Sequence, residues 1–343
     1  HTPLTPNKYA TSRDSAYRMG NYLVRRLLQT IIVIFGVTLL TFLSLHLAGD
    51  PTLLYVSERA SEEEIAETRA KLGFDKPLYQ QYISFVTNAA RGDFGNSLRT
   101  RTPAFELVLE RLPATIELTL FAMFIAIFFA IPIGILAAMN RGTALDGGVM
   151  LFAMFGQSMP SFWLGIMLIL VVGLRLGWLP ISGHVPVIQP MLDGDWATAM
   201  RNIPDAIRHL ILPGITLATF SLARNARLIR SSMLEVLSQD YITTAKAKGL
   251  RTWTVMGRHA FRNALIPFIT IVGLEFGFLL SGVVVIETVF SWPGVGRLVF
   301  NSINQRDIPV VQSAVIFFSL LFVFLNLLVD LVYTMLDPRI RLN

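Results

Sequence analysis

The clearest chemical pattern in the chain lies in Thr243–Pro267, where basic side chains alternate with small and apolar ones. Tyr241–Lys248 is a small-residue stretch with a preference for helix, and Gly249 permits a sharp turn directly after it. An apolar stripe with three-residue spacing follows, formed by Leu250, Trp253 and Met256. The pattern predicts a short amphipathic helix with a basic rim, of the kind that anionic lipid headgroups attract. No aromatic or groove motif supports a nucleic-acid contact.

Catalytic patterns are missing from the sequence. It contains neither a GxxxxGK[ST] phosphate loop nor a Gly-Lys pair, so hydrolysis of nucleotide by this chain is not expected. It has no cysteine and no HExxH motif, and its few histidines are scattered. We therefore expect no catalytic residues, no metal site and no cofactor bound by this chain.

Four polar residues lie at membrane depth, and Glu275 is the most unusual of them. An acidic side chain in the middle of an apolar run costs free energy unless it is paired with another group or in contact with water. Glu275 could line a pathway and attract a cationic group, or it could be a protonated or paired acid between helices. Gln157, Ser158 and Asn326 are expected to form interhelical hydrogen bonds, with pathway lining as the second possibility. One buried acid is weak support for a proton relay.

The elements that carry these residues are predicted to be membrane-spanning helices. The chain has 343 residues, of which 53% are hydrophobic and 15% charged, against about 25% charged in soluble domains. A helix needs about 20 apolar residues to cross a bilayer. Four runs satisfy this directly, and two are less clean, which predicts an all-α protein of six spans: Leu27–Leu47, Leu118–Met139, Gly147–Leu174, Leu210–Ala223, Ala264–Ile286 and Ile308–Val329.

Basic residues predict the orientation of these spans. Lys and Arg beside short loops mark the cytoplasmic side. They fall on one side of a six-span topology and place both termini in the cytoplasm: Arg25, Arg26, Arg141, Arg224, Arg227, Arg230, Lys246, Lys248, Arg251, Arg258, Arg262, Arg339 and Arg341. The net charge of +6 is explained by this topology. The arginines at 224, 227 and 230 are expected to anchor lipid headgroups or to support the cytoplasmic surface segment.

The remaining segments divide the chain into regions. Residues 1–18 are read as a tag or linker remnant, and residues 19–343 as one transmembrane domain. Residues 49–111 predict a small outer cap of helices, with Ser61 and Glu64 as a capping box and Gly73 as a stop. Gly177–Arg208 is read as an outer loop because of its Pro and Gly residues. Trp292, in the segment Thr288–Asp307, is expected to be an interface anchor beside a turn.

The order of residues in the cytoplasmic segment resembles a known family signature. Permease subunits of binding-protein-dependent ABC transporters carry Glu-Ala-Ala, three residues and then Gly at this place. Here the segment is Thr243-Thr244-Ala245-Lys246-Ala247-Lys248-Gly249, so the first two positions depart from the family pattern. The later Ile-x-Leu-Pro of that pattern is displaced, to Ala264-Leu265-Ile266-Pro267.

These departures are typical of the dipeptide/oligopeptide/nickel branch, which the chain resembles from Met19 to Asn343. Its first-permease type is indicated by Ala48-Gly49-Asp50-Pro51 and the outer cap. The other matching segments follow in the same order: Leu72–Leu78, Gly92–Ser97, Arg111–Leu118, Ser158–Trp163, Glu287–Gly294 and Leu336–Arg341.

The resemblance implies one half of a translocation pathway in a bacterial cytoplasmic membrane. The partners would be a second permease, two ATPase subunits that bind ATP and Mg, an external solute-binding protein and membrane lipids. Residues 238–262 would couple the spans to an ATPase, through Thr244, Ala245, Lys246, Gly249, Leu250 and Arg251. The cargo would be di- or oligopeptides, with nickel or another small solute as the alternative. A stand-alone ion-coupled carrier or channel is the rival from a different class.

Overall fold

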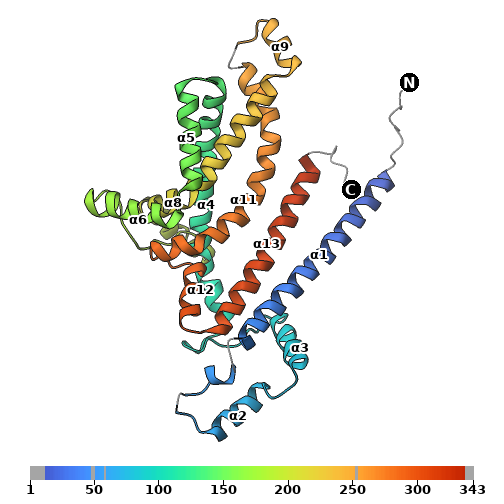
Figure 1. Ribbon diagram of the computed structural model, residues 1–343, viewed down its shortest axis with the longest axis vertical. Coiled ribbons are helices and arrows are strands. Elements are labelled where there is room, and N and C mark those ends of the chain that lie inside the picture. The colour runs from blue at the N-terminus through green and yellow to red at the C-terminus, as the bar shows by residue number, and fades with distance from the viewer. Residues whose placement is uncertain (1–11, 48–50, 58, 252–253, 337–343) are drawn as a thin grey trace. The chain divides into compact units, whose positions relative to one another are not determined.

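The computed structural model describes residues 12–47, 51–57, 59–251 and 254–336. Within these ranges the chain is helical and contains no strand, which agrees with the all-α expectation. The backbone divides into two compact units, one formed by residues 1–94 and 312–343 and the other by residues 95–311. Their helices are shown in Figure 1, and each unit is considered by itself.

The first unit contains two long helices and the small helices of the expected cap. α1 (Ser12–Leu47) and most of α13 (Ile308–Leu336) lie beside each other, and Gln312 donates a hydrogen bond to the Thr41 carbonyl oxygen at 3.1 Å. η1 (Pro51–Leu54), α2 (Glu62–Leu72) and α3 (Leu78–Ala89) follow α1. α1 includes residues 12–18, the end of the segment that was read as a tag or linker remnant.

The predicted capping signals of this unit are confirmed. The Ser61 side chain accepts a hydrogen bond from the Glu64 backbone N–H, and the Glu64 carboxylate accepts one from the Ser61 N–H. These two bonds satisfy amides that the helix itself leaves free. α2 ends at Gly73, whose φ of 74° is the left-handed conformation that glycine adopts without strain. Pro77 precedes the first residue of α3.

The second unit is a bundle around α8 (Trp196–Leu237). α4 (Ala104–Met139), α5 (Ala144–Ser158) and α11 (Arg262–Val289) pack against it. The backbones come close at Gly134 of α4, where a Cβ would lie 2.7 Å from the Ala226 carbonyl oxygen of α8. Small residues therefore allow the backbones of α4 and α8 to touch.

Shorter elements complete this unit. They are α6 (Ser161–Leu168), η2 (Ile169–Arg175), α7 (Ile188–Leu192), α9 (Asp240–Ala247), η3 (Val255–Phe261) and α12 (Val295–Asn304). Figure 1 shows α9 and α12 at opposite ends of the unit. We refer to these as the α9 end and the α12 end.

Two expected boundaries were wrong. The run Gly147–Leu174 is not one straight helix, because the chain bends by 103° between α5 and α6, where Pro160 lacks the N–H that would continue the helix. The expected loop Gly177–Arg208 ends earlier, since α8 begins at Trp196. Its cap is Asp195, which accepts a hydrogen bond from the Thr198 N–H at 3.0 Å. The hydrogen bonds from Thr198 lower the pKa of Asp195.

Length and composition can be compared directly with the expected spans. Among the described residues, three helices are long and apolar enough to cross a membrane: α4, α8 and the described part of α13 up to Leu327. The bent pair of Ala144–Ser158 and Ser161–Arg175 makes four if it counts as one span. The apolar part of α1 within these residues, Leu28–Ser44, is shorter.

Candidate functional site

The basic segment that the sequence predicts to be cytoplasmic forms a defined helix and turn. α9 covers Asp240–Ala247, and Lys248 caps it by donating its N–H to the Thr244 carbonyl oxygen at 3.1 Å. The Gly249 N–H reaches the Lys246 carbonyl oxygen at 2.9 Å, and Gly249 has a φ of 77°. A residue with a Cβ is strained in this conformation, so glycine sets the direction in which the chain leaves α9. A helix is present where Tyr241–Lys248 was expected to favour one, and Gly249 makes the expected turn.

The two faces of α9 have different surroundings. Ile242 and Ala245, three residues apart, are buried in a cluster with Ile229 and Met233 of α8 and with Val255 of η3. Thr244, Lys246, Gly249, Leu250 and Arg251 are exposed. Ala245, which was expected among the coupling residues, is buried in this cluster, where α9 packs against η3. The surface that α9 offers to another molecule is the opposite face.

The apolar stripe expected after Gly249 is divided between two environments. Met256 is buried in the same cluster, and Leu250 is 40% exposed. Leu250 and Arg251 are not helical, and the next described helical residue is Thr254. Trp253, the middle residue of the stripe, lies outside the described residues. The exposed segment is thus α9 with its turn, and the chain beyond the turn returns to the core through η3.

Three arginines of α8 each bind a partner on a neighbouring helix. Arg230 donates two hydrogen bonds to the Asp146 carboxylate of α5, at 2.5 and 2.7 Å. Arg227 donates to the side-chain oxygen of Gln157, also on α5. Arg224 donates to Glu275 of α11 at 2.9 Å. We expected these arginines at lipid headgroups or at an ATPase contact, but their guanidinium groups connect α8 to α5 and α11.

This arrangement answers the question that the sequence left open about Glu275. Its side chain is 1% exposed and accepts a second hydrogen bond, from the Asn225 amide at 2.7 Å. Glu275 is therefore a paired acid between α8 and α11, and its carboxylate is covered by Arg224. A buried acid is costly without such a partner, which is why both residues must be considered together.

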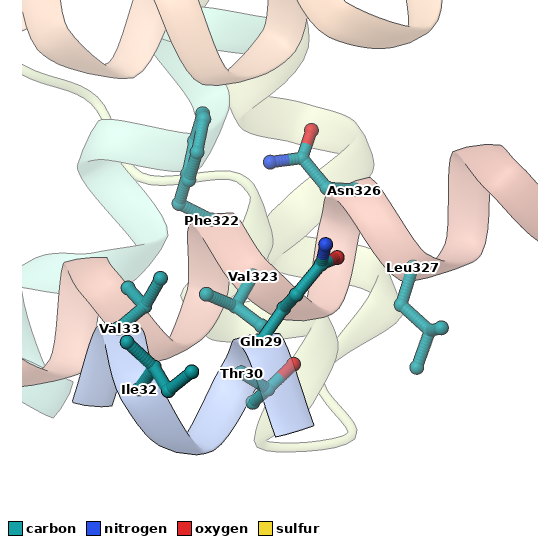
Figure 2. A pocket seen from close by; sticks show the side chains of 8 residues that line it. All are labelled: Gln29, Thr30, Ile32, Val33, Phe322, Val323, Asn326 and Leu327. Atoms are coloured by element: carbon teal, nitrogen blue, oxygen red, sulfur yellow. The ribbon is translucent and has the colours of Figure 1, made fainter. Parts of the chain in front are cut away.

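Three of the four candidate pathway residues can be described in the second unit and one in the first. Gln157 is the partner of Arg227, and Ser158 is exposed at the end of α5. Asn326 belongs to the first unit, where it helps to line a pocket of about 380 Å³. Figure 2 shows the side chains that line this pocket, which come from α1 and α13: Gln29, Thr30, Ile32, Val33, Phe322, Val323, Asn326 and Leu327.

Sequence reasoning missed a buried polar cluster at the α12 end. The Glu287 carboxylate accepts hydrogen bonds from the Thr115 hydroxyl at 2.7 Å and from the Arg297 N–H at 2.9 Å. Thr115 Oγ1 in turn accepts the N–H of Val295 at 2.8 Å. These bonds fasten the beginning of α12 to α4 and α11. The signal was present in the segments Arg111–Leu118 and Glu287–Gly294, but nothing in their spacing shows that they meet.

Trp292 is part of the same end and is not an interface anchor. It is 1% exposed, and its Nε1 donates to the Ala114 carbonyl oxygen at 2.8 Å. Its ring meets the His184 imidazole edge to face, with 4.6 Å between centroids. The His184 Nε2 lies 2.6 Å from Glu117, which also accepts the backbone N–H groups of Val187 and Ile188. Glu117 thereby fixes the segment between η2 and α8.

Comparison with known proteins shows to which family the chain belongs. Residues 130–342 match the binding-protein-dependent transport system inner membrane component family, and residues 19–119 match its N-terminal membrane component. The di/tripeptide transport system permease protein DppB of Pseudomonas aeruginosa (strain UCBPP-PA14) is 45% identical over 94% of this chain and 99% of its own length.

Two relatives from Escherichia coli (strain K12) are similar over the same share of the chain. They are the dipeptide transport system permease protein DppB and the glutathione transport system permease protein GsiC, each 42% identical over 94% of this chain and 99% of its own length. The resemblance stated from the sequence motifs is confirmed. The chain belongs to the family of binding-protein-dependent transport system inner membrane components.

Proposed function

We propose that the chain is a permease subunit of an ATP-driven importer for short peptides, chiefly dipeptides. The observation that carries this proposal is the similarity over nearly the whole chain to permeases whose names specify dipeptide transport. The glutathione relative has the same identity as the Escherichia coli dipeptide permease, which favours short peptides as the cargo class rather than one peptide.

The chain would work in a larger assembly. A second permease would complete the pathway, a solute-binding protein would deliver the peptide, and two ATPase subunits would hold ATP and Mg. This chain would bind no cofactor. It would cross a bacterial cytoplasmic membrane six times with both termini in the cytoplasm, and residues 49–111 would form its outer cap. Residues 19–343 would act as one transmembrane domain.

The coupling contact is proposed for the exposed face of α9 and its turn. Thr244, Lys246, Gly249, Leu250 and Arg251 are exposed there and would meet the ATPase. Ile242 and Ala245 hold the other face against α8 and η3, and η3 continues into α11. A push on α9 would therefore move α8 and α11 as packed bodies. Ala245 would contribute to coupling from the inner side.

Reconstitution tests the function directly. The purified chain, the second permease, the ATPases and the binding protein are placed in liposomes, and uptake of a labelled dipeptide is followed. We expect uptake with ATP and with all components, and none with this chain alone. Dipeptide transport by the chain alone, driven by an ion gradient, would contradict the proposal and support the stand-alone carrier.

A further inference from the structure

A small groove lies where α5, α6, α8 and α11 meet in the second unit. Its volume is about 160 Å³, and its lining is apolar apart from a few hydroxyl groups. Phe220 of α8 and Phe278 of α11 form one wall, with stacked rings whose centroids are 5.2 Å apart. Phe278 is 47% exposed, so this wall can be reached from outside the unit.

Positive charge lies at one end of this groove. The Arg224 guanidinium lies over the Phe278 ring, 5.5 Å from its centroid, and the Arg224 side chain is 35% exposed. One turn further along α8, Arg227 is exposed and has the neutral Gln157 as its partner. Gln157 directly follows Gly156, another lining residue. The groove and the two guanidinium groups are thus adjacent.

The charges at this end do not cancel. Glu275 neutralises Arg224, but Gln157 carries no charge, so Arg227 leaves a net positive charge at the exposed surface. Two buried donors near it, Arg224 Nε and Gln157 Nε2, have no hydrogen-bond partner within the described part of the chain. The acceptor Asn225 Oδ1 is also without a partner among the described residues, and because buried polar atoms are nearly always satisfied, a polar ligand group or water is expected at this place.

From these observations we propose that the groove and Arg224 with Arg227 form a transit site for the C-terminal carboxylate of a peptide, with its apolar side chain against Phe220 and Phe278. This inference rests on the proposed function and adds the contact residues. Arginine matches the planar carboxylate with parallel hydrogen bonds. The Arg224–Glu275 pair weakens the attraction, which suits a site that must release its ligand.

The dimensions are compatible with a dipeptide. Arg224 lies four residues after Phe220, and Arg227 lies seven residues after it. These spacings correspond to roughly 6 and 10 Å along a helix at about 1.5 Å per residue. An extended dipeptide is about 7 Å long at roughly 3.5 Å per residue. A carboxylate at the arginines therefore leaves the rest of the peptide at the aromatic wall.

This assignment reverses the charge expected for the ligand group that binds at the site. Glu275 could have attracted the amino terminus of a peptide if its carboxylate faced a pathway. Because Arg224 and Asn225 cover it, the group presented to a ligand is a guanidinium. The site should select the acidic end of the peptide.

The test compares a dipeptide with its C-terminal amide in the complete reconstituted importer. For each cargo, uptake by the Arg227→Gln complex is divided by uptake by the unaltered complex. A preference of the binding protein for one cargo affects both values equally and therefore does not change the ratio. We expect the ratio to fall roughly tenfold for the free acid, as for loss of a charge-assisted hydrogen bond, and to remain near one for the amide. Arg227→Lys should lie between. Arg208→Gln, an exposed position at the other end of α8, is the matched control.

Other outcomes would overturn the inference. Equal losses for both cargoes indicate a structural role for Arg227, and ratios near one for both show that the arginine does not contact the peptide. A loss that depends only on the anionic lipid content of the liposomes identifies a lipid headgroup as the ligand. If the unaltered complex takes up no dipeptide, the proposed function fails, and no variant ratio is then needed to show it.

A labelling measurement covers the case in which Arg227→Gln does not assemble. The chain contains no cysteine, so Thr219→Cys places one unique thiol of this subunit in the groove. We expect dipeptide to slow its modification severalfold while the importer is turning over. An unchanged modification rate would refute the site.

Discussion

The two ends of the second unit hold their buried acids in different ways. At the α12 end, Glu287 and Glu117 accept hydrogen bonds from backbone N–H groups, a threonine hydroxyl and a histidine. Towards the α9 end, Asp146 and Glu275 bind the long side chains of Arg230 and Arg224 from a single helix, and each accepts one further hydrogen bond, from the Gly142 N–H and the Asn225 amide.

The difference concerns what can move without breaking a bond. A backbone N–H cannot follow a displaced carboxylate unless its whole segment moves, whereas an arginine side chain can adjust its rotamers. The α12 end is therefore built as a fixed closure. The α9 end allows helices to shift against one another, and α9 itself has two buried residues, Ile242 and Ala245, and a hydrogen bond from the Asn263 amide of α11 to the Tyr241 hydroxyl. We infer that motion enters at the α9 end and is resisted at the α12 end.

The largest expected effect comes from adding a methyl group at the α12 end, where the helices leave no room for it. At Gly296, a Cβ would lie 2.6 Å from the Cα of Val284, which belongs to the α11 backbone. Gly296→Ala must push α12 away from α11 and should lower the free energy of unfolding by about 3 kcal/mol. Denaturant titration in mixed micelles measures it. Gly147→Ala, where a Cβ meets nothing within 4 Å, is the control and should cost far less.

A smaller effect is expected from removing an arginine near the α9 end. Arg224→Met leaves Glu275 buried without its ionic partner and should cost about 2 kcal/mol, discounted because Arg224 is partly exposed. Adding Glu275→Gln removes the unpaired charge and should restore most of the stability. The same unfolding titration on both variants checks this, and a double variant no more stable than Arg224→Met would show that the pair is not coupled.

The smallest of the three effects distinguishes the buried face of α9 from its exposed face. Ala245→Asp places a carboxylate in the cluster under α9 and should lower the free energy of unfolding by about 1 kcal/mol, since the site is near the surface. Ala247→Asp makes the same change on the same helix at an exposed position and should leave stability unchanged. Equal unfolding free energies for these variants would contradict the assignment of the faces.

Local signals in the sequence predicted local structure well. Gly249 fixed the end of α9, and Ser61 with Gly73 fixed both ends of α2, because each acts through its own backbone. The bend at Pro160 was misjudged, since apolar composition does not reveal direction. The burial of Ala245 was not predicted, because small residues serve close packing inside a chain as well as between chains.

The polar pairs could not be predicted from one sequence. Glu275 lies 51 residues from Arg224, and Glu287 lies 172 residues from Thr115. Their meeting depends on how α4, α8 and α11 pack, which the hydrophobic pattern of each helix does not specify. Only the cost of burying an acid indicated that Glu275 needed a partner, without naming it.

The central claim is that α9, rather than α12, receives the motion of the ATPases. Because the chain has no cysteine, single cysteines at Ala247 of α9 and Asn301 of α12, both exposed, can be compared in the assembled importer with a thiol-to-amine cross-linker. The account predicts cross-links to the ATPase subunits from Ala247→Cys and none from Asn301→Cys. Cross-links from Asn301→Cys alone, from both positions equally, or from neither, would contradict it.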